Sequence, residues 1–83
     1  MPIAFVFLNI IPDTEREVID AIRAMLKFVP SVKYEIQGVY GVYDMALKIE
    51  TKGMEDLRHL VAETRRIGKI KSTITMLVNE EQE

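Results

Sequence analysis

Asp44 is the first side chain in this 83-residue chain whose surroundings suggest chemistry. It ends the stretch GVYGVYD (38–44), in which two glycines permit a tight turn or the close approach of a ligand. A carboxylate beside exposed backbone N–H groups suits a small zwitterion, because the carboxylate takes the ammonium while N–H groups or hydroxyls take the other end. The alternative is a turn aspartate that accepts hydrogen bonds from neighbouring N–H groups, and the pattern alone favours that structural role.

Hydroxyl side chains gather further along the chain, at Ser72, Thr73 and Thr75. In a strand Thr73 and Thr75 share one face, which is the least that two hydroxyls need in order to bind one carboxylate together. Threonine is also common wherever a strand is half exposed. The sequence therefore leaves open both a carboxylate-binding pair and ordinary strand threonines.

Composition argues against several other kinds of site. The chain has no cysteine, which removes disulfides, iron–sulfur clusters and cysteine nucleophiles. Its one histidine, His59, argues against an all-protein transition-metal site. No nucleophile–base pair and no phosphate-binding glycine motif is present. We therefore expect neither catalysis nor a cofactor.

Charge and hydropathy bear on partners and location. The formal net charge is −2, and the 11 basic residues are scattered rather than gathered into the stripe that phosphate contacts require. No stretch approaches the roughly 20 apolar residues of a membrane span. The apolar start of the chain lacks the features of a signal peptide. We expect a cytoplasmic protein that contacts neither nucleic acid nor membrane directly.

The apolar pattern predicts four strands and two helices. β-Branched and aromatic runs and a two-residue alternation indicate strands, and a 3.6-residue period indicates helices. The first helix is expected to start with a capping box of Thr14 and Glu17 and to end at Pro30, and the second to end at Gly68. Residues 79–83 are expected to form a frayed acidic tail. The predicted strands span 3–11, 32–38, 45–50 and 70–78.

The order of these elements, β-α-β-β-α-β, predicts a fold class. Two right-handed βαβ crossovers interleave into one four-stranded antiparallel sheet with both helices on one face, the ferredoxin-like α+β sandwich. No linker or long repeat indicates a second domain, so we expect a single domain over residues 1–83.

The first predicted strand is apolar on both sides. Phe5 and Phe7 point one way while Val6 and Leu8 point the other, and two helices can cover only one side of a sheet. The uncovered side would expose more apolar surface than a monomer usually tolerates. We therefore expect a two-fold homodimer formed through the sheet. The alternative is that loops cover this face.

Three motifs in order resemble the effector-binding domain of the Lrp/AsnC transcription regulators. That domain, called RAM for regulation of amino acid metabolism, carries a G-x-Y-D turn and a V-x-x-T-x-T strand at similar spacing. The resemblance covers essentially the whole chain. The matching residues here are Gly41-Val-Tyr-Asp44, an apolar helix with Leu57, Leu60 and Val61, and Ile70-Lys-Ser-Thr-Ile-Thr75.

The resemblance implies an assembly and a ligand. RAM domains dimerise through their sheets and often form rings of four or five dimers, so an octamer or decamer is implied. Free amino acids bind as effectors in clefts between dimers. By motif position, Gly41, Tyr43 and Asp44 would form one wall of such a cleft, and Thr73 and Thr75 would come from the same or a neighbouring dimer.

Two departures from the family refine this hypothesis. Because Met1 nearly adjoins the first strand, we expect no upstream helix-turn-helix of the family's kind, and therefore a stand-alone RAM protein that could pair with a full-length Lrp/AsnC regulator. The chain also has Lys69-Ile70 where the family has Gly-Val. Rival interpretations are an ACT-like regulatory module, a dimeric ferredoxin-like enzyme with its pocket between helices and sheet, and a ligand-free structural oligomer.

Overall fold

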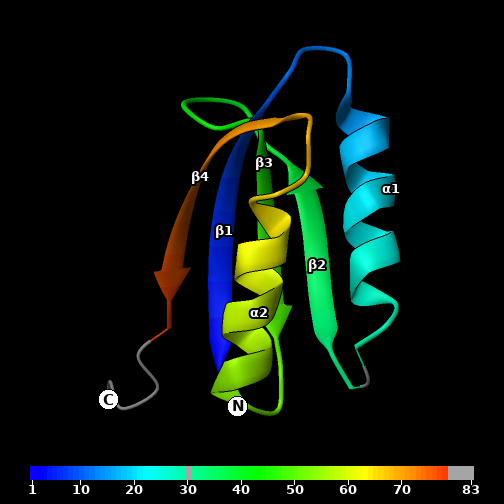
Figure 1. Cartoon of the computed structure of the whole chain (residues 1–83). Coiled ribbons are helices and arrows are strands. Elements are labelled where there is room, and N and C mark those ends of the chain that lie inside the picture. The colour runs from blue at the N-terminus through cyan, green and yellow to red at the C-terminus, as the bar shows by residue number, and fades with distance from the viewer. Residues whose placement is uncertain (30, 79–83) are drawn as a thin grey trace.

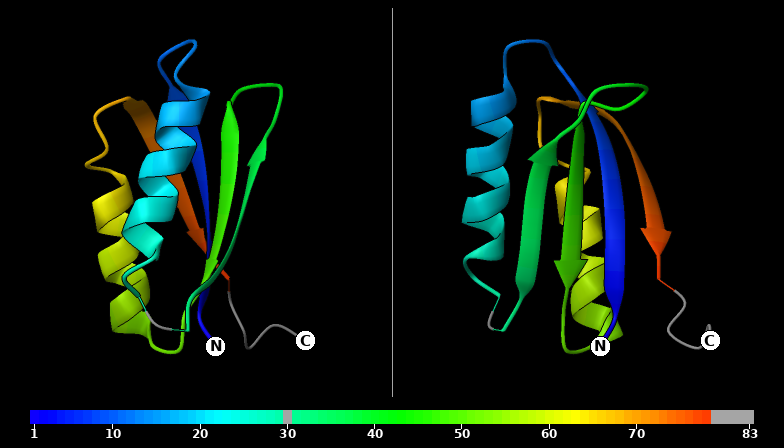
Figure 2. Two further views of the ribbon diagram at one scale, coloured as in Figure 1. Left: turned by 90° about the vertical axis from the view of Figure 1, so that its right-hand side faces the viewer. Right: turned by 180° about the vertical axis from the view of Figure 1, so that it is seen from behind.

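The structure is a computed structural model that describes residues 1–29 and 31–78. Its strands form one antiparallel sheet in the order β2-β3-β1-β4, and both helices lie on the same side of it (Figures 1 and 2). The predicted ferredoxin-like α+β fold is confirmed. The elements are β1 (Ile3–Ile10), α1 (Glu15–Leu26), β2 (Lys33–Gly38), β3 (Met45–Glu50), α2 (Met54–Thr64) and β4 (Ile70–Leu77).

The core lies between the sheet and the helices, on what we call the covered face. β1 is central, and its alternate residues Ala4, Val6 and Leu8 have no exposed surface. The helices meet them with aliphatic residues spaced at the helical period. The core residues are Ala4, Val6, Leu8, Ile10, Val18, Ile22, Leu26, Met45, Leu47, Ile49, Leu57, Leu60 and Val61.

No element of the described chain covers the opposite side of the sheet, the open face (Figure 2, right). Phe5 lies opposite Met76, and Phe7 lies opposite Ile74 on one side and Ala46 on the other. Phe5 is 36% exposed, Ile74 47% and Met76 51%. The two-sided apolar pattern predicted for the first strand is confirmed, and loops of the described residues do not cover this face.

The start of α1 differs from the prediction. The Thr14 hydroxyl donates to the carbonyl of Ile11 at 2.6 Å and makes no cap bond to the helix. Asp13 has φ of 67°, and the Thr14 N–H also bonds to Ile11, so a tight turn takes the hydroxyl that a capping box would use. The predicted capping box with Glu17 is therefore wrong.

Both helices end before the residues expected to stop them. α1 ends at Leu26, and the Lys27 N–H continues the helical pattern with a bond to the carbonyl of Arg23. α2 ends at Thr64, and hydrogen bonds from Arg66 to Glu63 and from Ile67 to Thr64 lead through turns toward β4. Gly68 does not cap the helix. Pro30 and the expected tail at 79–83 lie outside the described residues.

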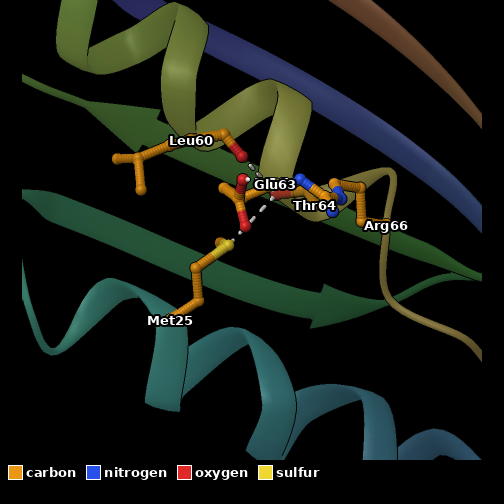
Figure 3. Close-up of polar contacts among 5 residues, drawn as sticks. All are labelled: Met25, Leu60, Glu63, Thr64 and Arg66. Carbon is orange, nitrogen blue, oxygen red and sulfur yellow. Dashed lines mark hydrogen bonds and ion pairs between the residues drawn. The ribbon is translucent and has the colours of Figure 1, made fainter.

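Thr64 is a polar residue inside the core, where α2 faces α1 (Figure 3). Its hydroxyl donates to the carbonyl of Leu60 at 2.8 Å and lies 3.9 Å from Sδ of Met25 in α1. A buried hydroxyl that bonds the preceding helical turn carries no unsatisfied donor. Thr64 can therefore pack between the helices without a large desolvation penalty.

Candidate functional site

The turn between β2 and β3 needs glycine at one position. Gly41 has φ of 133°, a conformation that L side chains rarely adopt. The Val39 N–H donates to the carbonyl of Asp44 at 3.0 Å and closes the loop, whose tip exposes Tyr40 completely. No neighbouring atom would meet a Cβ at Gly41, so the glycine serves the backbone conformation and not close packing within the chain.

Asp44 holds the end of β3 against β1. Its backbone N–H donates to the carbonyl of Leu8 at 2.9 Å, and its Oδ2 accepts the N–H of Ile10 at 3.0 Å. The side chain thus replaces a backbone acceptor where the regular ladder has ended. No hydrogen bond within the described residues uses the second carboxylate oxygen, and the residue is exposed. Asp44 thus accepts a backbone hydrogen bond, as the structural interpretation of the sequence predicted, and its second carboxylate oxygen has no hydrogen-bond partner among the described residues.

A pocket of about 360 Å³ opens beside Asp44, and we call it the Asp44 pocket. Asp13 and Glu15 add negative charge, while Lys71 supplies the one cation in the lining. Among residues 1–29 and 31–78, no group of three or more acidic or histidine side chains is close enough to hold a metal ion. The lining residues are Ile10, Pro12, Asp13, Glu15, Asp44 and Lys71.

Lys71 reaches this pocket through an irregularity that the sequence did not reveal. β1 and β4 change register between Asn9 and Ile10, so that Asn9 lies opposite Ser72 and Ile10 lies opposite Ile70. Lys71 is the residue left over between them, and a bulge of this kind redirects a side chain out of the regular alternation. The nearby Ser72 hydroxyl accepts a bond from Asn9 at 3.3 Å.

Tyr43 does not line the Asp44 pocket. Its ring packs against that of Phe7, with centroids 5.7 Å apart and an interplanar angle of 41°. Phe7 belongs to the open face, so the aromatic pair joins the turn to that face. The geometry is that of a tilted aromatic contact.

The two threonines also lie apart from Asp44 within one chain. Thr73 is opposite Leu8 and Thr75 is opposite Val6, so both side chains point to the helix side of β4. Neither threonine lines the Asp44 pocket, and Thr75 instead lines a second pocket against α2. A site that unites all five residues across an assembly stays a prediction.

A groove of about 630 Å³ lies between the helices, where Met25 and Phe28 of the α1 side face Asp56, His59 and Glu63 of α2. Phe28 is 84% exposed and His59 is exposed. The polar side chains Asp56 and His59 of this groove are thus at the surface, whereas the rival enzyme hypothesis requires a polar or titratable side chain inside a pocket between helices and sheet.

Within the described residues, no helix is long and apolar enough to cross a membrane.

A solved protein of the same size provides the family assignment. FFRP-DM1 is 35% identical to this chain, the match covers 95% of this chain and 100% of that one, and the TM-score is 0.77. This chain is an Lrp/AsnC-like domain. No family model matches it.

More distant structures share the fold of the Lrp/AsnC-like domain. AsnC of E. coli is 22% identical with a TM-score of 0.61, over 93% of this chain and 50% of that one. A dimeric ferredoxin-like protein of unknown function from Thermobifida fusca is 15% identical with a TM-score of 0.68, over 93% and 88% of the two chains.

A curated enzyme contains a segment similar to the Lrp/AsnC-like domain. Homocitrate synthase of Sulfurisphaera tokodaii is 33% identical over 58 residues, which are 70% of this chain. The match spans only 12% of the enzyme's length.

Proposed function

We propose that this Lrp/AsnC-like domain is a non-catalytic module that binds a free amino acid and assembles with copies of itself. One observation carries the proposal: the Asp44 pocket holds a carboxylate oxygen without a partner in the described chain together with the ammonium of Lys71. A zwitterion needs both charges in one small cavity. Ile10 and Pro12 add apolar surface for the rest of the ligand.

The pocket's openness to solvent fits a site that is completed by a neighbouring molecule. Asp44 and Glu15 are exposed, and a ligand held by exposed charges alone would be weakly bound because water and salt screen them. A second dimer placed against the β2–β3 turn would exclude water and could bring Thr73 and Thr75 of another chain. Rings of dimers, such as octamers or decamers, are therefore part of the proposal.

The open face supports the dimer within that assembly. Its apolar centre is flanked by cross-strand pairs of opposite charge, Lys33 opposite Glu50 and Glu35 opposite Lys48. A rim that carries both positive and negative side chains can form ion pairs with the same rim of a second copy about a two-fold axis. A rim of one charge would repel that copy. The Thermobifida fusca protein of the same fold is described as dimeric, which supports the same arrangement here.

We also propose a partner that responds to amino-acid binding by this domain. A domain that joins such rings could exchange into the ring of a full-length Lrp/AsnC regulator and carry its effector there. The similar segment in homocitrate synthase supports a module that can also serve an enzyme. With either partner, we propose that the domain binds an amino acid and that the partner carries out the DNA binding or the catalysis.

Calorimetric titration of the assembled protein with each of the twenty amino acids tests this function. Asp44→Asn keeps a side-chain oxygen for the Ile10 N–H but removes the charge, so the fold should survive while affinity falls about tenfold or more. Lys71→Met should weaken binding similarly. Lys69→Met is the control, because this exposed lysine does not line the pocket.

The outcomes separate the parts of the proposal. If no amino acid binds the unaltered assembly, the sensing function is wrong. If an amino acid binds equally well to Asp44→Asn, the function stands and the Asp44 pocket is the wrong site.

A further inference from the structure

We propose that a second pocket, between α2 and β4, binds a small aliphatic dicarboxylate. This Arg pocket has a volume of about 260 Å³ and shares no lining residue with the Asp44 pocket. The inference is independent of the amino-acid site proposed above. The lining residues are Arg58, Val61, Ala62, Arg65, Thr75 and Leu77.

Two guanidinium groups define the chemistry of the Arg pocket. Arg58 lies on α2 and Arg65 directly follows the last residue of this helix; both are exposed, and within the described residues neither forms an ion pair. Arg66, which does not line the pocket, pairs with Glu63 at 3.5 Å (Figure 3). The pocket therefore keeps two cations available, and guanidinium binds carboxylates through two parallel hydrogen bonds.

The spacing of the two arginines favours a ligand with two anionic ends. Arg58 and Arg65 are seven residues apart, about two helical turns or 10.5 Å along the axis. This backbone spacing lets each flexible side chain hold its own carboxylate. A chain with a carboxylate at each end can meet one guanidinium with each end.

The floor between the arginines is apolar. Val61 is buried beneath the pocket, Ala62 lies on the exposed side of the helix, and Leu77 is 53% exposed at the edge of the sheet. An aliphatic spacer would cover this surface, whereas a phosphate or other compact anion would leave it wet. The lining therefore suits a dicarboxylate with a methylene chain.

Thr75 adds polar groups at the side of the pocket. Its Oγ1 is buried and has no hydrogen-bond partner in the described chain, which is unusual for a buried hydroxyl. The Val78 N–H donates to Ile3 in β1, and because antiparallel residues alternate, the N–H of Thr75 is directed away from β1 toward the free edge of β4. A carboxylate near Arg58 or Arg65 would have this donor within the same pocket.

The Arg pocket stays accessible in the proposed dimer. Thr75 and Leu77 lie opposite Val6 and Ala4, which belong to the covered face, so the pocket opens on the helix side of the sheet. The open face lies on the other side (Figure 2). A second copy bound through the open face would not fill the Arg pocket.

Titration with glutarate, followed by amide chemical shifts and calorimetry, tests the inference. Glutarate has no ammonium group and so does not match the Asp44 pocket. We expect saturable shifts around Val61, Ala62, Thr75 and Leu77, and binding at least about tenfold weaker in Arg58→Met or Arg65→Met. Both positions are exposed, and methionine keeps helix propensity at Arg58 within α2, so the fold should be retained, as circular dichroism would verify.

Two controls decide between the outcomes. Arg66→Met removes one positive charge of the same helix end without touching the pocket, and should leave glutarate affinity unchanged. Valerate, with one carboxylate at matched ionic strength, should bind at least about tenfold more weakly than glutarate. Absence of glutarate binding, equal loss in Arg66→Met, or shifts confined to Ile10, Asp44 and Lys71 would each overturn the inference.

Discussion

The two sides of β1 are built from similar residues but lie in opposite surroundings. On the covered face Val6 and Leu8 are fully buried beneath the helices, whereas on the open face Phe5 is 36% exposed beside Met76 at 51%. The difference arises from the rest of the chain, because both helices lie on one side of the sheet. An apolar face that the described residues leave uncovered is a candidate surface for association. The helices therefore bury the covered face, while the described residues leave the open face exposed to solvent.

The largest effect is expected from truncation on the covered face. Leu47→Ala removes a fully buried side chain and should lower the free energy of unfolding by about 2–5 kcal/mol, measured by urea denaturation. Ile74→Ala is the matched truncation on the open face, and its effect should depend on protein concentration because it acts through association. Equal, concentration-independent losses in the two variants would break the comparison between the faces.

A charge on the open face should act mainly on assembly. Phe5→Glu would place a carboxylate in the apolar centre of the proposed dimer interface. Even with Lys48 opposite on β3, burying this charge should raise the dissociation constant about tenfold or more, measured by sedimentation. Phe28→Glu is the control, because Phe28 is an 84% exposed phenylalanine in the groove between the helices. If Phe28→Glu separated the copies and Phe5→Glu did not, the interface would belong on the helix side.

The smallest effect concerns the aromatic pair that joins the turn to the open face. Tyr43→Ala should cost about 0.5–1.5 kcal/mol through loss of the ring contact with Phe7, and Tyr43→Phe should cost less because the ring remains. Thermal unfolding of the two variants at one protein concentration measures the difference. Equal losses in the two variants would mean that the hydroxyl, and not the ring, carries the contact.

Much of the fold could be predicted because burial leaves a periodic signal. The alternation at Phe5, Val6 and Phe7 predicted both faces of β1, and the helical period predicted the core side of both helices. The choice that one side chain makes between two possible hydrogen-bond partners leaves no periodic signal in the sequence. Thr14 matched a capping pattern, yet its hydroxyl bonds to Ile11 in the preceding turn.

The candidate site was predictable only in part. The glycine turn pointed to Asp44, whose carboxylate lines a pocket, but Lys71 enters that pocket through a bulge that depends on pairing between distant strands. Thr75 was predicted from its hydroxyl as part of the effector site, and in the single chain it lies against α2 instead. Arg58 and Arg65 carried no motif, and only the position of β4 beside α2 brings them into a pocket.

The solution mass of the unaltered protein tests most directly whether the open face is an interface. Light scattering at micromolar concentration should give about twice the chain mass of 9.6 kDa, or a higher multiple of that dimer, and Phe5→Glu should lower it toward the single chain. A mass of one chain at every concentration, with the helices and sheet intact, would contradict the account.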